Sequence, residues 1–143
     1  MTREYSQVVT CWPSLRTVVH VAYTALRELC GVRSGDKGDI SDLTLFVDDT
    51  ETYDLVCREV TVERVREHFG ELVEGDVERF EAPNVLAVKF VMYGALGGGG
   101  PRSLRSDNLG KTLGGALLRL RIDVPDEILA RSARNRRRAP LPS

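Results

Sequence analysis

The chain has 143 residues, of which 42% are hydrophobic and 29% are charged, and its formal net charge is -1. This length suits one domain with a substantial core, and the composition is typical of a water-soluble globular protein rather than a disordered chain. The small net charge gives no support to nucleic-acid binding as the main function.

Neither membrane crossing nor secretion is indicated. The longest apolar run, residues 85–92, is interrupted by Lys89 and is far shorter than the roughly 20 residues that span a bilayer. Residues 1–9 lack the sustained apolar stretch and the small-residue cleavage site of a secretory signal. We therefore expect a cytoplasmic protein without contact to a membrane.

The cysteines favour reduced thiols over disulfides or metal ligands. Cys11, Cys30 and Cys57 are odd in number and widely separated, and no CxxC pair occurs. His20 and His68 add no ligand-like spacing to them. We expect no metal and no cofactor, and we interpret Cys30 and Cys57 as core residues.

Three regions differ in composition. We expect a lead at residues 1–25 whose order is undefined, one domain at residues 26–125, and a disordered basic tail at residues 126–143. From about residue 130 the tail holds five of the 20 basic residues and no acid, which leaves 15 basic against 21 acidic residues elsewhere. The tail can therefore lie against its own acidic domain, and an arm that binds nucleic acid is the less favoured alternative.

The first predicted elements of the domain are two strands and two helices. Residues 26–32 give a weak strand pattern, and the alternation of Leu43, Leu45 and Val47 predicts a second strand. Apolar residues at helical spacing over 53–60 predict a helix. Thr61 is placed to cap a second helix, which we expect to stop at Gly70.

A hairpin and a last helix follow. Residues 77–82 and 85–93 flank a Pro-Asn turn, and the second strand is apolar on both faces, which indicates a central strand. Residues 108–119 show the clearest amphipathic stripe, with Asp107 as the expected N-cap. Gly110 and Gly114 lower the helix propensity of this stretch, so we expect them to pack closely against the sheet or a partner. The order of elements predicts an α+β fold, a two-layer ferredoxin-like sandwich whose mostly antiparallel sheet carries helices on one face.

The sequence RSGDKGD, residues 33–39, is the first candidate site. Gly35 and Gly38 permit positive φ, so successive backbone N–H groups can form an anion-binding nest, to which Arg33 and Lys37 add positive charge. A strand follows instead of a helix, which excludes a Walker A loop or a dinucleotide fingerprint. The alternative interpretation is a tight charged hairpin without a ligand.

The second candidate is the glycine-rich stretch 94–101 with the residues that lead to the last helix. Backbone amides at a helix N-terminus, together with Arg102 and Ser103, can hold a phosphate or carboxylate. A flexible connection is the alternative.

Two single residues are also candidates. Lys89 could be a desolvated catalytic lysine, although a lysine in such a strand more often reaches an edge or pairs with an acid. His68 is most simply a favourable charge near a helix end.

Several of these motifs together resemble the small domain of the acyclic terpene utilisation proteins, the AtuA-like family. The resemblance runs in order through RSGDKGD (33–39), VTVERV (60–65), RFEAPN (79–84), GALGGGG (94–100), SLRSDNLGK (103–111) and IDVP (122–125). It implies a ferredoxin-like topology and breakdown of branched acids or terpenoids as CoA thioesters. In that family the domain usually follows a much larger one, so the resemblance implies a separately encoded small subunit or a stand-alone homologue.

Two functional hypotheses remain open. In the first, the chain is a subunit that acts on an acyl thioester, by hydration or dehydration, together with a larger AtuA-like chain. The catalytic candidates are then Asp36, Lys37 and Asp39, and the substrate-binding candidates are Arg33, Ser34, Gly35, Gly38, Gly98, Gly99, Arg102, Ser103 and Lys111. In the second, the chain is a non-catalytic module that stabilises a larger partner or a homo-oligomer.

Overall fold

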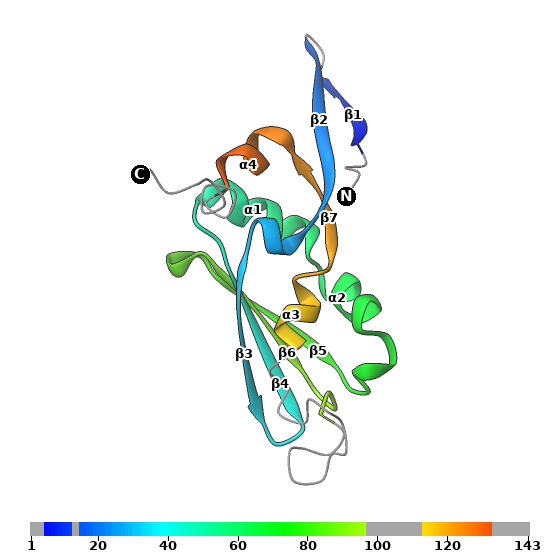
Figure 1. Cartoon of the computed structure of the whole chain (residues 1–143), viewed down its shortest axis with the longest axis vertical. Coiled ribbons are helices and arrows are strands. Elements are labelled where there is room, and N and C mark those ends of the chain that lie inside the picture. Colours follow the sequence, from blue (N-terminus) through cyan, green and yellow to red (C-terminus); the bar gives the residue numbers. More distant parts are fainter. Residues whose placement is uncertain (1–4, 13–14, 97–112, 133–143) are drawn as a thin grey trace, which may run out of the picture.

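Seven strands form two antiparallel sheets in the computed structural model, which describes residues 5–12, 15–96 and 113–132 (Figure 1). The larger sheet has the order β3-β4-β6-β5 and the smaller one the order β1-β2-β7. The strands are β1 (Tyr5–Trp12), β2 (Leu15–Ala25), β3 (Gly31–Lys37), β4 (Ile40–Phe46), β5 (Val77–Ala82), β6 (Ala87–Met92) and β7 (Arg121–Pro125). The helices are α1 (Thr50–Glu59), α2 (Val62–Phe69), α3 (Leu113–Leu117) and α4 (Asp126–Arg131), with short 3-10 turns η1 (Leu26–Glu28), η2 (Gly70–Leu72) and η3 (Pro83–Val85).

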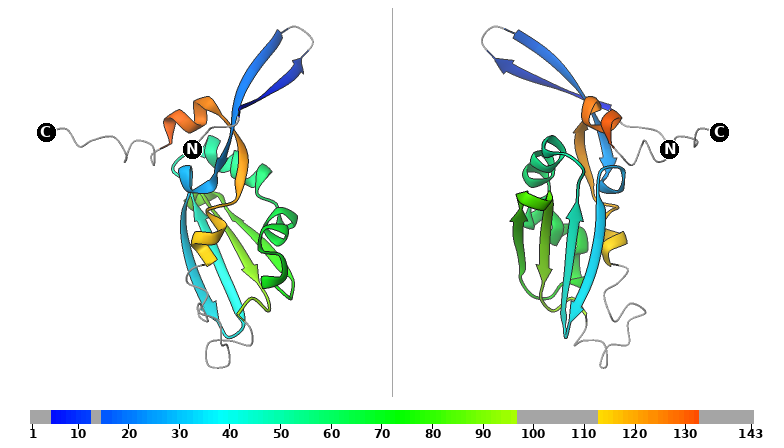
Figure 2. Two further views of the ribbon diagram at one scale, coloured as in Figure 1. Left: turned by 45° about the vertical axis from the view of Figure 1, so that its right-hand side comes forward. Right: turned by 90° about the vertical axis from the view of Figure 1, so that its left-hand side faces the viewer.

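Among the described elements, helices cover one face of the larger sheet and leave the other face, here called the open face, uncovered (Figure 2). Alternation along β4 and β6 directs Leu43, Leu45 and Phe90 into a core where each is at most 1% exposed. Helices α1, α2 and α3 supply Val56, Val65 and Leu117 to the same core. This arrangement confirms the predicted α+β sandwich with helices on one face of an antiparallel sheet.

The two helices predicted between residues 53 and 70 and the central strand are confirmed, whereas the expected N-cap of the last helix, Asp107, lies outside the described residues. Helix α1 begins after Asp49, whose carboxylate accepts a hydrogen bond from the Thr52 amide at 2.8 Å. Helix α2 is capped by Thr61 and ends at Gly70, which has a φ of 55°. Strand β6 lies between β4 and β5, as its apolar sequence predicts.

Two strand predictions differ from the structure. The strand predicted over residues 26–32 begins only at Gly31. The residues before it form η1 instead, where Leu26 is fully buried and its amide N–H donates to the Leu120 carbonyl at 2.9 Å. The described part of the last helix ends at Leu117, and β7 follows. Strand β7 was missed because Ile122 and Val124 alternate over only five residues before Pro125.

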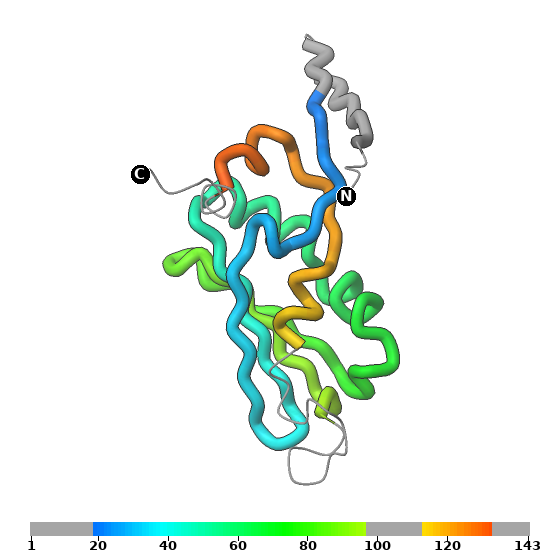
Figure 3. The backbone as a smooth tube through the Cα atoms, viewed as in Figure 1, coloured from blue at the N-terminus to red at the C-terminus, as the bar shows by residue number. Residues whose placement is uncertain are grey.

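The lead and the beginning of the tail are also folded. Strands β1 and β2 form an antiparallel hairpin in the lead, and β2 continues through η1 into β3, which joins the two sheets by one continuous segment (Figure 3). The expectation of disorder from residue 126 is wrong at its start, because Ile128 and Leu129 of α4 are 6% and 4% exposed. The burial of these two side chains offsets the conformational entropy that is lost when α4 becomes ordered. The rest of the tail, residues 133–143, lies outside the described structure.

None of the helices in the described ranges is both long and apolar enough to pass through a bilayer.

Candidate functional site

The sequence RSGDKGD forms a tight β-hairpin. Strand β3 continues to Lys37, the turn is Gly38 and Asp39, and Lys37 pairs with Ile40 at the start of β4. Gly38 has a φ of 62°, a left-handed conformation that glycine adopts at little cost. The backbone therefore matches the hairpin alternative for this motif: residues 33–37 belong to a strand, and Gly38 and Asp39 alone form the turn.

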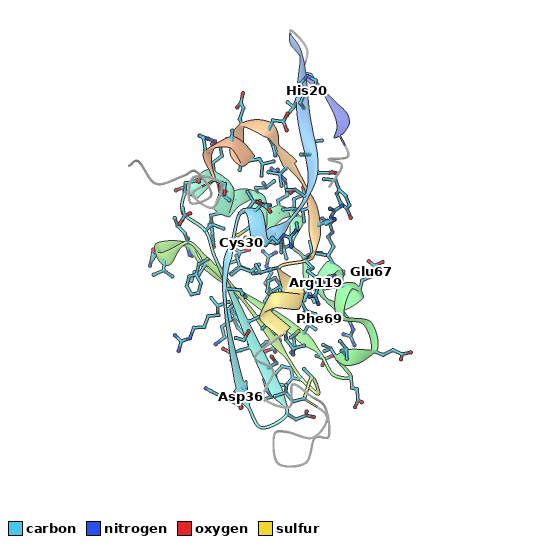
Figure 4. The ribbon with its side chains drawn as sticks, in the orientation of Figure 1. His20, Cys30, Asp36, Glu67, Phe69 and Arg119 are labelled. Atoms are coloured by element: carbon cyan, nitrogen blue, oxygen red, sulfur yellow. The ribbon has the colours of Figure 1, made fainter. Side chains whose placement is uncertain are left out.

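The pairing of β3 with β4 divides the predicted site residues between two faces. Ser34 pairs with Leu43 and Asp36 with Ser41, so both belong to the face that the helices cover. Arg33, Gly35 and Lys37 alternate with them and belong to the open face. Figure 4 places Asp36 close to the end of the hairpin.

On the covered side, Ser34 holds the beginning of α3. The Ser34 hydroxyl oxygen accepts a hydrogen bond from the Gly114 amide at 3.1 Å. A Cβ atom at residue 114 would lie 2.3 Å from this oxygen and 3.1 and 3.2 Å from the Val32 methyl carbons. The predicted close packing of Gly114 on the sheet is confirmed, whereas Gly110 lies outside the described residues.

Asp39 holds the chain just before the glycine run. Its carboxylate accepts a hydrogen bond from the Leu96 amide at 2.9 Å, and its carbonyl accepts one from the Ala95 amide at 3.1 Å. Both ends of segment 97–112 are therefore attached to the hairpin, one through Asp39 and the other through Ser34. The predicted site residues Gly98, Gly99, Arg102, Ser103 and Lys111 fall within this segment, outside the described residues.

The open face carries a groove of about 410 Å³ beside the hairpin. Lys89 of β6 forms an ion pair with Asp42 of β4, with 2.9 Å between the Nζ and Oδ2 atoms. The Asp42 carboxylate lies over Gly35, where a Cβ atom would be only 2.3 Å from Oδ1. The groove, which we call the open-face groove, is lined by Arg33, Ser34, Gly35, Asp36, Lys37, Asp42, Thr44, Phe46 and Lys89.

The open-face groove is a positively charged site with one apolar wall. Its lining holds three cations, Arg33, Lys37 and Lys89, and two carboxylates, Asp36 and Asp42, of which Asp42 is paired with Lys89. Phe46 is 40% exposed at one end of the groove. Arginine and lysine bind phosphate and carboxylate groups through charge-assisted hydrogen bonds, so the groove suits a ligand with an anionic group and an apolar part.

Lys89 does not have the surroundings of a catalytic lysine. Its side chain is 45% exposed and is paired with Asp42, which matches the structural interpretation of this residue. His68 likewise has a structural contact, because its Nε2–H donates to the Ala116 carbonyl at 2.7 Å.

The thiols of Cys30 and Cys57 are core or near-core groups. Cys30 is fully buried, and burial raises the pKa of the Cys57 thiol, which favours the protonated, unreactive form. Within the described residues, no three His, Cys, Asp or Glu side chains come close enough to hold a metal ion.

Three residues of the groove were not predicted as site residues. Asp42, Thr44 and Phe46 occupy alternate positions of β4, opposite to the buried Leu43 and Leu45. The period of two that identified this strand also places these residues on its other face. The alternation does not show which strand lies beside β4. Lys89 comes close to Asp42 and Thr44 because β4 pairs with β6.

Comparison with known proteins identifies one family. The family model described as AtuA ferredoxin-like domain matches residues 24–123. No curated protein and no solved structure gave a match.

Proposed function

The chain belongs to the AtuA ferredoxin-like domain family, and on this basis we propose that it is a small subunit of an AtuA-like assembly that acts on acyl thioesters. The observation that carries this proposal is the attachment of both ends of segment 97–112 to the hairpin of residues 33–39. The described residues on both sides of that segment, Leu96 and Gly114, thereby contact the hairpin motif from far along the sequence. Ser34 and Asp39 serve to position these two residues.

The open-face groove provides the anion-binding part of the proposed site. A CoA thioester carries phosphates at one end, and Arg33 and Lys37 are exposed cations on the same face as Phe46. These residues would hold the anionic groups, whereas an apolar part of the ligand would lie against Phe46. The hydration or dehydration of such a thioester also needs a group that transfers a proton.

Asp36 is the better of the two proton-transfer candidates, although its pairing with Ser41 directs it to the face opposite Arg33 and Lys37, so it can act on a bound ligand only at the end of the hairpin. The Asp39 carboxylate already accepts a hydrogen bond from Leu96, while Asp36 is exposed near the end of the hairpin. An exposed carboxylate becomes an effective base when the site is closed from water. Because Asp36, Arg33 and Lys37 are all exposed in this chain, a second chain must complete the site, which is why we propose a subunit.

Reconstitution with a larger AtuA-like chain tests this function. We expect the complex to convert an acyl-CoA, Lys37→Ala to raise KM, and Asp36→Asn to lower kcat by about 100-fold or more. Arg58→Gln, a change at an exposed residue of α1, is the control and should leave both constants unchanged. If Asp36→Asn and Lys37→Ala both retain full activity, the assignment of the hairpin to the active site is wrong.

The second candidate function is a non-catalytic interaction module. It is favoured by the open face, where Phe46 and Phe80 are 40% and 52% exposed on either side of the Lys89–Asp42 pair. Such aromatic side chains contribute strongly to protein interfaces. A Phe80→Ser variant should then lose the larger chain in co-purification, whereas a monodisperse monomer that binds acyl-CoA tightly by itself would contradict this function.

A further inference from the structure

A second cleft lies away from the hairpin, between α2 and the strands β2 and β7. It has a volume of about 370 Å³ and is lined by Tyr23, Arg64, Glu67, His68, Leu120 and Arg121. None of these residues lines the open-face groove. We call this site the α2 cleft, and no motif of the sequence pointed to it.

Arg64 forms a fixed wall of the α2 cleft. Its guanidinium donates to the Glu59 carbonyl at 3.0 Å, to the Glu59 carboxylate at 3.2 Å and to the Arg121 carbonyl at 3.3 Å. These contacts join α2 to β7 and compensate the charge of Arg64. Arg64 therefore also fixes the backbone of Arg121, the other arginine of the cleft.

Arg121 differs from Arg64 because its charge is not compensated in this way. Its guanidinium carbon lies over the Tyr23 ring, 5.7 Å from the ring centroid. Within residues 5–12, 15–96 and 113–132, no carboxylate approaches Arg121 to ion-pair distance, and Glu67, the one acid of the cleft lining, lies on the outer side of α2 (Figure 4). The aromatic ring orients the guanidinium and leaves its donors available.

His68 adds a third nitrogen group to the cleft. Since its Nε2–H donates to the Ala116 carbonyl at 2.7 Å, the ring is held in place, and Nδ1 of the neutral ring is an acceptor that can receive a hydrogen bond from a hydroxyl or N–H group of a ligand. Tyr23 is 39% exposed and Leu120 is half-buried, so both offer apolar surface beside the basic groups. A planar guanidinium with free donors recognises oxyanions by paired hydrogen bonds.

From these contacts we propose that the α2 cleft binds a small molecule that carries an oxyanion, a phosphate or a carboxylate, on a flat apolar body. The oxyanion binds Arg121, the flat body rests on Tyr23 and Leu120, and a hydroxyl or N–H group of the ligand can donate to His68 Nδ1. This site does not depend on the proposed acyl-thioester function, because it shares no residue with the open-face groove.

Amide chemical-shift mapping on the full-length chain tests the proposal, with phenyl phosphate, benzoate and inorganic phosphate as probes. Saturable shifts at Tyr23, His68, Leu120 and Arg121 are expected for phenyl phosphate, with weaker binding of inorganic phosphate, which lacks the ring. Benzoate decides whether a carboxylate is accepted in place of a phosphate. Shifts confined to the arginines of residues 133–143 or to residues 33–37, or no saturable shifts, would overturn the proposal.

Two variants separate Arg121 from general positive charge. Arg121→Gln should weaken phenyl phosphate binding by roughly tenfold or more, because a charge-assisted hydrogen bond is lost. Arg119→Gln removes the same charge from an exposed residue two positions earlier and should leave binding unchanged. Equal affinity of the Arg121→Gln variant and the wild type would overturn the assignment, and the wild-type shift map decides the matter if that variant does not fold.

Discussion

The contact between α3 and β3 predicts that two adjacent glycines respond in opposite directions to the same substitution. In Gly114→Ala the new Cβ atom would lie 2.3 Å from the Ser34 hydroxyl oxygen, whereas nothing lies within 4 Å of a Cβ atom at Gly115. Overpacking of this kind costs about 1–3 kcal/mol, and the helix preference of alanine over glycine offsets up to about 1 kcal/mol. We expect Gly114→Ala to lose about 1–2 kcal/mol and Gly115→Ala to gain up to about 1 kcal/mol.

Thermal unfolding followed by circular dichroism measures this difference. For a chain of this size, about 1 kcal/mol corresponds to a shift in Tm of roughly 4 °C, so the two variants should differ clearly. The double variant Ser34→Ala/Gly114→Ala removes the closest contact and should recover part of the stability lost in Gly114→Ala. If Gly114→Ala is as stable as Gly115→Ala, then α3 does not pack on Ser34 in solution.

Three further predictions concern other contacts of the structure. Gly35→Ala should change stability by less than about 1 kcal/mol in the same melts, because the Asp42 carboxylate can swing away from the new Cβ atom; a larger loss would show that this carboxylate is fixed. Asp49→Ala should cost about 1 kcal/mol in urea unfolding, because the N-cap bond to the Thr52 amide is lost, and an unchanged midpoint would contradict the cap. Burial raises the pKa of Tyr53 to about 12, from 10.0, so its contribution to stability is complete below pH 10 and is lost as the pH rises through about 12. Tyr53→Phe should flatten the loss of stability over that interval at little cost at neutral pH, since the hydroxyl makes no more than a weak contact with the Cys57 thiol; an unchanged alkaline profile would refute this.

The larger sheet and its helices could be predicted because each element carries its own period in the sequence. Leu43 and Leu45 alternate on β4, and Val62, Val65 and Phe69 repeat at helical spacing on α2. The smaller sheet could not be predicted in the same way. Strand β7 is short, and its stabilising partner β2 lies about a hundred positions earlier in the sequence, so its pairing depends on the tertiary fold.

The motif of the candidate site was found from the sequence, but the direction of its side chains was not. RSGDKGD was interpreted either as a loop that converges on one ligand or as a tight charged hairpin; the structure matches the hairpin, and strand pairing through Lys37 sends Arg33 and Ser34 to opposite faces. The resemblance to a family selected this motif and the glycine-rich segment. It could not show that Asp39 and Ser34 bond to the two ends of the glycine-rich segment, because those contacts span 57 and 80 positions.

Among the described residues, strand β1 of the lead hairpin has a neighbouring strand on one side only. Strand β1 is the outer strand of its sheet, and its sequence YSQVVTCW contains no charged residue and no proline. Natural proteins commonly place lysine, proline or a bulge on such an edge to prevent pairing with another chain. Strand β1 lacks the first two of these safeguards, so its backbone is open to the addition of a strand from another molecule.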